Sequence, residues 1–141
     1  MAQNRNNNSS GVNITSASHV CMRHCTFAKG QQSIIITGSI DNIVMFNNYV
    51  HDCGDLDALS DTDENGFSVS GGDNIWMLDN LITRTAGSGM VTNVGSTDPN
   101  TTVQHIYMGR NVAHRVRQSA FWTKQSTYCI FSQNLACNVI G

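Results

Sequence analysis

The sequence predicts an all-β fold, a solenoid of about five stacked coils. One pattern of apolar residues and asparagines recurs five times along the chain, and a second short apolar segment precedes each copy. Internal repeats with a period of roughly 20–50 residues are typical of solenoids, because one repeat alone cannot bury its apolar face. The chain has 141 residues, which is long enough for one domain with its own core.

The main repeat is an eight-residue segment with apolar residues at alternating positions. Its five copies are VCMRHCTF, IVMFNNYV, IWMLDNLI, IYMGRNVA and CIFSQNLA, and they begin at Val20, Ile43, Ile75, Ile106 and Cys129. The third column holds Met22, Met45, Met77, Met108 and Phe131. The sixth column holds Cys25, Asn48, Asn80, Asn111 and Asn134. Alternation turns one face of each strand inward, so stacked parallel coils place Ile on Ile and Met on Met.

A shorter apolar strand precedes each copy of the repeat. These first strands are VNIT, IIIT, FSVS, MVTN and FWTK, and they begin at Val12, Ile34, Phe67, Met90 and Phe121. The coil of about 22 residues is interrupted by two insertions, around residues 52–65 and 95–102. Asparagines stacked at a bend can bond amide to amide along the axis. The spacing therefore predicts a parallel β-helix with an asparagine ladder.

This pattern resembles the right-handed parallel β-helix superfamily of pectate lyases, polygalacturonases and phage tailspikes. The resemblance covers residues 12–141 and rests on the repeat spacing and the ladder. It implies three strands per coil, with residues 49–51, 81–83 and 112–114 in third strands. An antiparallel sandwich is the alternative, but a sandwich would not require a fixed register of Met and Asn. We expect one β-helix domain at 12–141, after a loose polar leader at 1–11.

Composition and charge exclude several classes of protein. Apolar residues make up 40% of the chain and are regularly placed, so disorder is not expected. The net charge of −2 gives no general electrostatic attraction to nucleic acid or to a membrane surface. No apolar run approaches the roughly 18 residues of a membrane span.

The five cysteines are an odd number without a CxxC pair, which argues against a disulfide framework or a zinc site. Free cysteines fit a reducing, cytoplasmic compartment, and no signal segment opens the chain. A secreted chain without its signal peptide would look the same, so the localisation stays open. Cys25 takes a ladder position and Cys129 an inward position, so we expect both thiols to be buried.

The superfamily resemblance implies a substrate along the outside of the first strands, walled by loops that leave the third strands. Arg115, Arg117 and Lys124 fall in this region. Their positively charged groups are able to donate hydrogen bonds to the carboxylates of an acidic sugar polymer. Trp122 offers a ring face on which a sugar can stack. The alternative is a basic loop that pairs with nearby acids.

The insertion at 52–65 holds six of the ten acidic residues. Clustered carboxylates are unfavourable unless they are solvated, paired or bound to a cation. Asp55, Asp57, Asp61 and Asp63 are able to supply oxygen ligands to calcium, although their spacing matches no EF-hand loop. The alternative is a solvated acidic loop.

No catalytic set can be named. Polygalacturonases show Asp-Gly-Phe/Ile-Asp and Gly-His-Gly steps, and the equivalent stretches here are Asn65-Gly66-Phe67-Ser68 and Gly87-Ser88-Gly89. The paired carboxylates of glycoside hydrolysis are therefore missing from the expected places. A polysaccharide lyase remains an alternative, with Lys124 or Arg117 as the base and the Asp loop as a calcium site, by analogy alone.

Strand alternation also predicts an outward apolar patch on the second and third strands. Its members are Val44, Phe46, Tyr49, Trp76, Leu78, Leu81, Tyr107, Val112, Ile130 and Leu135. A contiguous apolar surface with Trp and Tyr is typical of an interface, so we expect a homodimer or trimer. The leading hypothesis is polysaccharide binding, alone or within a larger carbohydrate-active protein. A lyase and a non-catalytic self-associating module are the alternatives.

Overall fold

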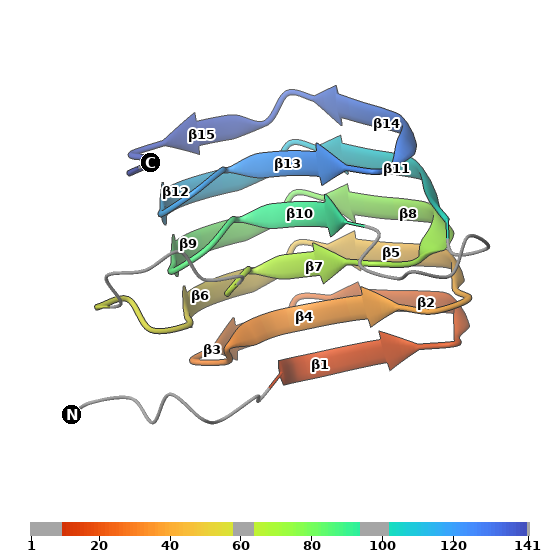
Figure 1. Ribbon diagram of the computed structural model, residues 1–141, viewed down its shortest axis with the longest axis horizontal. Coiled ribbons are helices and arrows are strands. Elements are labelled where there is room, and N and C mark those ends of the chain that lie inside the picture. The colour runs from red at the N-terminus through yellow and green to blue at the C-terminus, as the bar shows by residue number, and fades with distance from the viewer. Residues whose placement is uncertain (1–9, 58–63, 94–101, 141) are drawn as a thin grey trace.

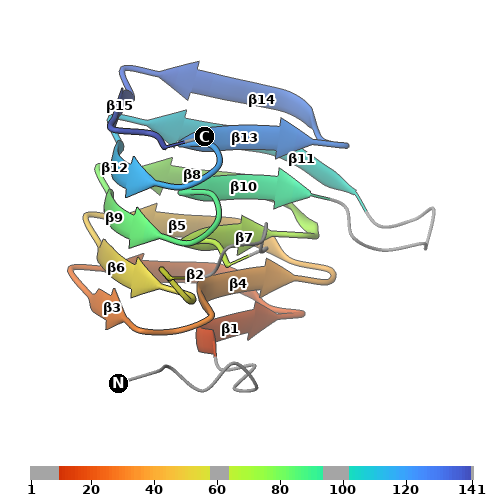
Figure 2. The same cartoon turned by 60° about the vertical axis from the view of Figure 1, so that its left-hand side comes forward.

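The computed structural model describes residues 10–57, 64–93 and 102–140. These residues form three parallel sheets of five strands each, and successive strands pass from one sheet to the next. Figure 1 and Figure 2 show the coils stacked along one axis, with the N-terminus at one end of the stack and the C-terminus at the other. No helix among these residues has the length and apolar character to cross a membrane.

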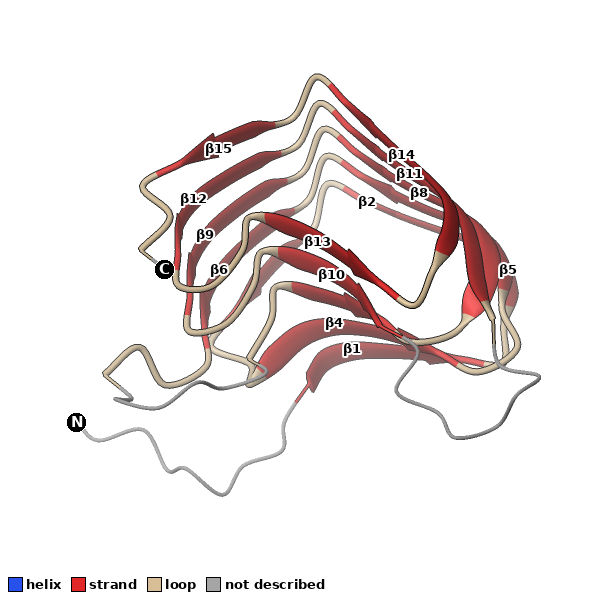
Figure 3. Ribbon diagram, turned by 45° about the horizontal axis from the view of Figure 1, so that its top comes forward, coloured by secondary structure: helices blue, strands red, loops and turns tan. Residues whose placement is uncertain are grey.

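Each sheet contains one strand from every coil. The first sheet holds β1 (Ser10–Thr15), β4 (Gln32–Thr37), β7 (Phe67–Val69), β10 (Met90–Asn93) and β13 (Phe121–Lys124). The second holds β2 (Ser18–Arg23), β5 (Asp41–Phe46), β8 (Gly72–Leu78), β11 (Val103–Gly109) and β14 (Thr127–Ser132). The third holds β3 (Thr26–Ala28), β6 (Tyr49–Cys53), β9 (Leu81–Thr85), β12 (Val112–Val116) and β15 (Leu135–Cys137). In Figure 3 the three sheets form the walls of the solenoid.

The predicted register is confirmed in the second sheet. The methionine column is aligned from Met22 through Met45, Met77 and Met108 to Phe131. The middle three methionines are at most 1% exposed, because each lies between two apolar side chains of the same column. The first strands align in the same way from Val12 to Phe121. The core is therefore one apolar column per inward position, continuous across the coils.

The asparagine ladder is confirmed at the bend between the second and third sheets. The backbone N–H of Asn48 donates to the Oδ1 of Asn80 at 3.0 Å, and that of Asn80 donates to the Oδ1 of Asn111 at 2.9 Å. The Nδ2 of Asn80 donates to the carbonyl of Met45, one coil back. Each ladder amide thus satisfies backbone groups that the bend would otherwise leave buried and unpaired.

The coils turn at three corner positions where non-glycine residues adopt left-handed φ angles of 50–63°. The first row is His19, Asn42, Asn74, His105 and Tyr128. The second row, just before the ladder, is His24, Asn47, Asp79, Arg110 and Gln133. The third row, at the end of the third sheet, is Lys29, Asp52, Arg84, Arg115 and Asn138. Because every coil turns at the same position, these side chains stand in rows along the corners.

The structure differs from the sequence-based expectations at the ends of the solenoid. β1 begins at Ser10, so two residues of the expected leader belong to the first sheet. Cys25 and Cys129 are half-buried rather than buried, because each lies in a terminal coil with one neighbouring coil instead of two. Cys53 lies in an inner coil and is buried, and this burial raises the pKa of its thiol to about 11.

Candidate functional site

The row of corner residues at the end of the third sheet carries opposite charges on neighbouring coils. Asp52 accepts hydrogen bonds from the Nε and the Nη2 of Arg84, the latter at 2.7 Å. The Nδ1 of His51 lies 2.8 Å from the same carboxylate. These contacts, led by the hydrogen bonds from Arg84, hold the pKa of Asp52 well below its usual range. The charge of Arg84 is therefore neutralised within the protein.

One coil further along, the same corner carries two arginines that line a pocket. A pocket of about 360 Å³ is lined by Leu56, Arg84, Thr85, Ala86, Arg115, Arg117 and Ile140. Arg115 is exposed, whereas Arg117 is half-buried. The backbone N–H of Arg117 donates hydrogen bonds to the carbonyls of Thr85 and Gly87, both at 3.2 Å. The structure thus brings together Arg115 and Arg117, although Arg115 lies in β12 and not in the loop predicted from the sequence. We call this feature the arginine pocket.

The Nη1 of Arg117 is buried and has no hydrogen-bond partner in the part of the chain that the structure describes. A buried donor on a charged group that lacks a partner is unfavourable by at least about 1–3 kcal/mol. Asp52 is already bonded to Arg84, so it does not balance the charges of Arg115 and Arg117. A bound anion in the arginine pocket would balance charge on Arg115 and Arg117, and it would reach the buried Nη1 if the guanidinium of Arg117 turned toward the pocket.

Trp122 and Lys124 project outward from β13, on the outer face of the first sheet. Trp122 is 40% exposed, and the Nζ of Lys124 lies 5.8 Å from the centre of its ring. Neither residue lines the arginine pocket. The predicted binding residues therefore form two pairs, Arg115 with Arg117 at the corner and Trp122 with Lys124 on the sheet.

The predicted calcium ligands are only partly described. Asp61 and Asp63 lie outside the described residues. The Oδ1 of Asp55 accepts the backbone N–H of Asp57 at 3.2 Å, and the Oε2 of Glu64 accepts the backbone N–H of Asp55 at 2.7 Å. Among the described residues, no group of three or more acidic, His or Cys side chains is placed to hold a metal ion. Calcium binding stays a prediction.

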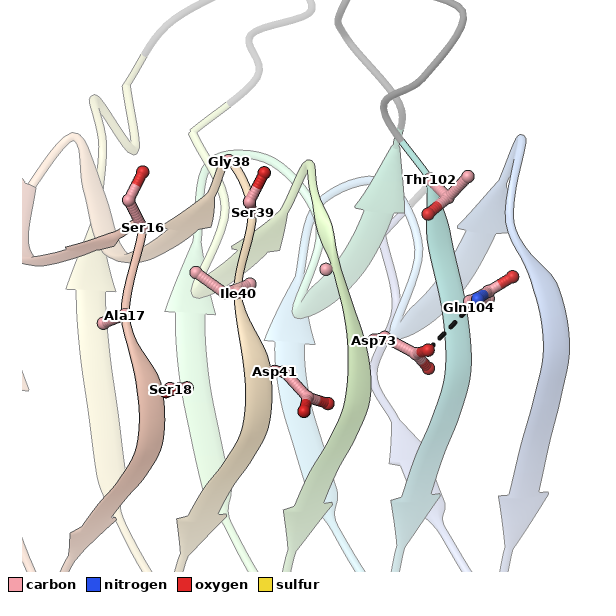
Figure 4. A pocket seen from close by; sticks show the side chains of 11 residues that line it. Ser16, Ala17, Ser18, Gly38, Ser39, Ile40, Asp41, Asp73, Thr102 and Gln104 are labelled. Atoms are coloured by element: carbon pink, nitrogen blue, oxygen red, sulfur yellow. Dashed lines mark hydrogen bonds between the residues drawn. The ribbon is translucent and has the colours of Figure 1, made fainter.

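A groove that the sequence analysis missed lies at the opposite edge of the first sheet, where the chain turns into the second sheet (Figure 4). Its volume is about 640 Å³, and four successive coils line it with residues 16–18, 38–41, 72–73, 102 and 104. We call it the corner groove. None of its lining residues is Lys or Arg.

Two carboxylates lie side by side in the corner groove. Asp41 and Asp73 are register partners on β5 and β8, and Figure 4 shows both projecting from neighbouring coils. Asn74 links them, since its Nδ2 donates to Asp41 at 3.0 Å and its backbone N–H donates to Asp73 at 2.7 Å. Burial raises the pKa of Asp73, but hydrogen bonds, chiefly from His105 and Gln104, outweigh it and leave this pKa below the usual value. Asp41 and Asp73 each come two residues before an isoleucine of the main repeat. This shared spacing is the signal in the sequence that would have placed the two carboxylates side by side.

The position that resembles the polygalacturonase motif has a structural role. Asn65 is buried, and its Oδ1 accepts the backbone N–H of Ser88 from the next coil at 2.8 Å. The amide therefore fixes the turn into the first sheet, at the place where that family has an acid.

The ten outward apolar residues lie on the second and third sheets, as alternation requires. None of the ten is fully buried, and Leu81, Ile130 and Leu135 are the most exposed, at 39%, 58% and 56%. Self-association through this patch stays a prediction.

Comparison with known proteins agrees with this architecture. A family model described as a right-handed β-helix region matches residues 3–139. No curated protein and no solved structure matches the chain. The match spans nearly the whole chain, and its fold is that of the three parallel sheets. The protein therefore belongs to the right-handed β-helix family.

Proposed function

We propose that this β-helix domain binds an acidic polysaccharide beside its first sheet, with a sugar carboxylate held by Arg115 and Arg117. The observation that carries the proposal is the pocket that Arg115 and Arg117 line together, in which the Nη1 of Arg117 has no partner among the described residues. A planar carboxylate is able to accept two parallel hydrogen bonds from one guanidinium group. Leu56 and Ile140 add apolar contact surface for the C–H groups of the sugar.

Partial burial strengthens this interaction. A charge pair fully exposed to water contributes little, typically below about 1 kcal/mol. A hydrogen bond to a partly buried charged group contributes about 1.5–3 kcal/mol. Trp122 and Lys124 would then serve a neighbouring sugar, the ring by stacking and the ammonium group by charge.

The test is affinity electrophoresis in gels that contain polygalacturonate. Arg117→Ala should weaken binding roughly tenfold to a hundredfold, because it removes a charged bidentate donor. The triple replacement of Arg115, Arg117 and Lys124 by Ala should abolish binding and change the free energy of unfolding by no more than about 1 kcal/mol.

A matched control comes from the other end of the third-sheet strand in the same coil. Arg110 has the same left-handed backbone conformation as Arg115, but its guanidinium is bonded to Asp79 at 2.6 and 2.8 Å. Arg115→Ala should weaken polygalacturonate binding, whereas Arg110→Ala should leave it unchanged. Equal effects of the two variants, or full affinity in the triple variant, would remove the arginine pocket from consideration. Ultraviolet absorbance of unsaturated sugar ends in the same mixtures would reveal lyase activity.

We further propose that the outward apolar patch of the second and third sheets joins two or three copies of the chain. Support comes from the exposure of the patch: none of its ten residues, Trp76 and Tyr107 included, is fully buried in the single chain. Aromatic residues in such patches are typical anchors of interfaces. This role is compatible with polysaccharide binding, because the arginine pocket lies at the border of the first and third sheets.

A further inference from the structure

At the corner groove, the third coil is one residue shorter than the second and carries two glycines. Between aligned positions, the second coil has Gly38-Ser39-Ile40 where the third coil has only Gly71-Gly72. A Cβ on Gly72 would lie 2.2 Å from the Cγ1 of Ile40, and one on Gly71 would lie 2.6 Å from the carbonyl oxygen of Gly38. The second coil therefore packs directly against these glycines, and Asp73 is the first residue of the third coil that presents a side chain to the corner groove.

The walls of the corner groove present groups that match sugar hydroxyls. The serine hydroxyls of the first two coils and that of Thr102 are exposed. The two oxygens of Asp41 accept one amide hydrogen bond each, from Asn42 at 2.6 Å and from Asn74 at 3.0 Å. A carboxylate has about four acceptor sites, so Asp41 keeps capacity for two further donors. Two hydroxyls on adjacent carbons of one sugar are suitably spaced for the two oxygens of one carboxylate.

An aromatic platform continues the corner groove toward the last coil. Tyr128 stacks on His105, with ring centres 4.8 Å apart and planes at 7°. The Nδ1 of His105 lies 2.7 Å from Asp73, which lines the groove. Tyr128 is 71% exposed, so the face of its ring away from His105 is open to solvent. Such a face can pack against the C–H groups of a pyranose ring.

We propose that the corner groove is a second carbohydrate site, which takes a neutral sugar unit with two adjacent hydroxyl groups and stacks the next unit on Tyr128. The two carboxylates and the lack of Lys and Arg exclude acidic sugars from this groove. The arginine pocket favours the opposite charge, so the two sites differ in the class of sugar they accept.

The experiment is affinity electrophoresis of the full chain in gels that contain a neutral polysaccharide: galactomannan, xyloglucan or a β-glucan. The wild type should be retarded by at least one of them. Ser39→Trp, which fills the groove, and Tyr128→Ala, which removes the platform, should each weaken that binding about tenfold or more. Both variants should keep the wild-type melting temperature and bind polygalacturonate as the wild type does.

His24→Ala is the matched control, because His24 also presents an exposed aromatic ring from a left-handed corner position, but at the bend between the second and third sheets. It should leave binding of the neutral polysaccharide unchanged. The proposal is overturned if no neutral polysaccharide retards the wild type, or if His24→Ala and Tyr128→Ala weaken binding equally. Loss of binding on addition of a calcium chelator would also overturn it, since a bound cation would then replace the direct carboxylate contacts. Polygalacturonate binding in the same gels separates failure of this site from failure of the arginine pocket.

Discussion

Replacement of Asn80 by Ala should destabilise the solenoid more than any single replacement at its ends. The Oδ1 of Asn80 accepts the backbone N–H of Asn48 at 3.0 Å, and its Nδ2 donates to the carbonyl of Met45 at 3.0 Å. Asn80 is 1% exposed, so water cannot replace these bonds. Two orphaned backbone groups at about 1–3 kcal/mol each predict a loss of about 2–6 kcal/mol in the free energy of unfolding.

Asn134→Ala provides the comparison within the same ladder. It removes equivalent bonds to the backbone N–H of Asn111 and the carbonyl of Met108, at 2.9 and 2.8 Å. Asn134 is half-buried at the open end of the stack, where water is able to take over these bonds. Urea denaturation of both variants measures the difference, which should be at least about 1 kcal/mol. Equal losses, or a loss below about 1 kcal/mol for Asn80→Ala, would refute the view that burial of the backbone partners sets the strength of the ladder.

Three further predictions concern the core, the charged corner and the apolar patch. Met77→Asp places an unpaired charge in the core and should unfold the domain, as seen by loss of the cooperative thermal transition; a variant that melts like the wild type would contradict the inward assignment. Because its pKa is depressed in the folded protein, Asp52 stabilises the fold above about pH 4, and this stabilisation is lost as the pH falls. The difference in melting temperature between the wild type and Asp52→Asn should therefore shrink below about pH 4, and a constant difference would argue against the ion pair. Light scattering should show a dimer or trimer for the wild type and a monomer for the Trp76→Glu, Phe46→Lys double variant; a monomeric wild type at high micromolar concentration would exclude self-association.

The fold could be predicted from the sequence because stacking in a parallel solenoid is a local rule repeated in every coil. Met45, Met77 and Met108 occupy one inward column, and a register shift of one residue would turn all three outward. The ladder adds a second constraint, since its asparagines must meet at the same bend. Two independent periodic signals in fixed phase leave few other folds that satisfy both.

The candidate sites were harder to predict, because they depend on the turns between sheets rather than on the aligned inward positions of the strands. Arg115 and Arg117 could be chosen from their charge, but the missing partner of the Arg117 Nη1 depends on how neighbouring coils pack around it. The corner groove depends on a coil that is one residue shorter than its neighbour at Gly71-Gly72. Differences in corner length are easily read as irregular spacing, which hides the alignment of Asp41 with Asp73.

The two kinds of position in this fold explain where binding is to be expected. Inward columns are restricted to apolar residues by packing, and the ladder amides are used by the backbone. Corner residues in the left-handed conformation are free of both restrictions, so Asp, Arg, His and Tyr occur there in rows. Along these rows neighbouring charges cancel, as in Asp52 with Arg84, or line a pocket, as at Arg115. Side chains at the same corner of neighbouring coils stand about 4.8 Å apart, the spacing of parallel strands. An extended polymer is the kind of ligand that can use such a row, because its successive units meet successive coils.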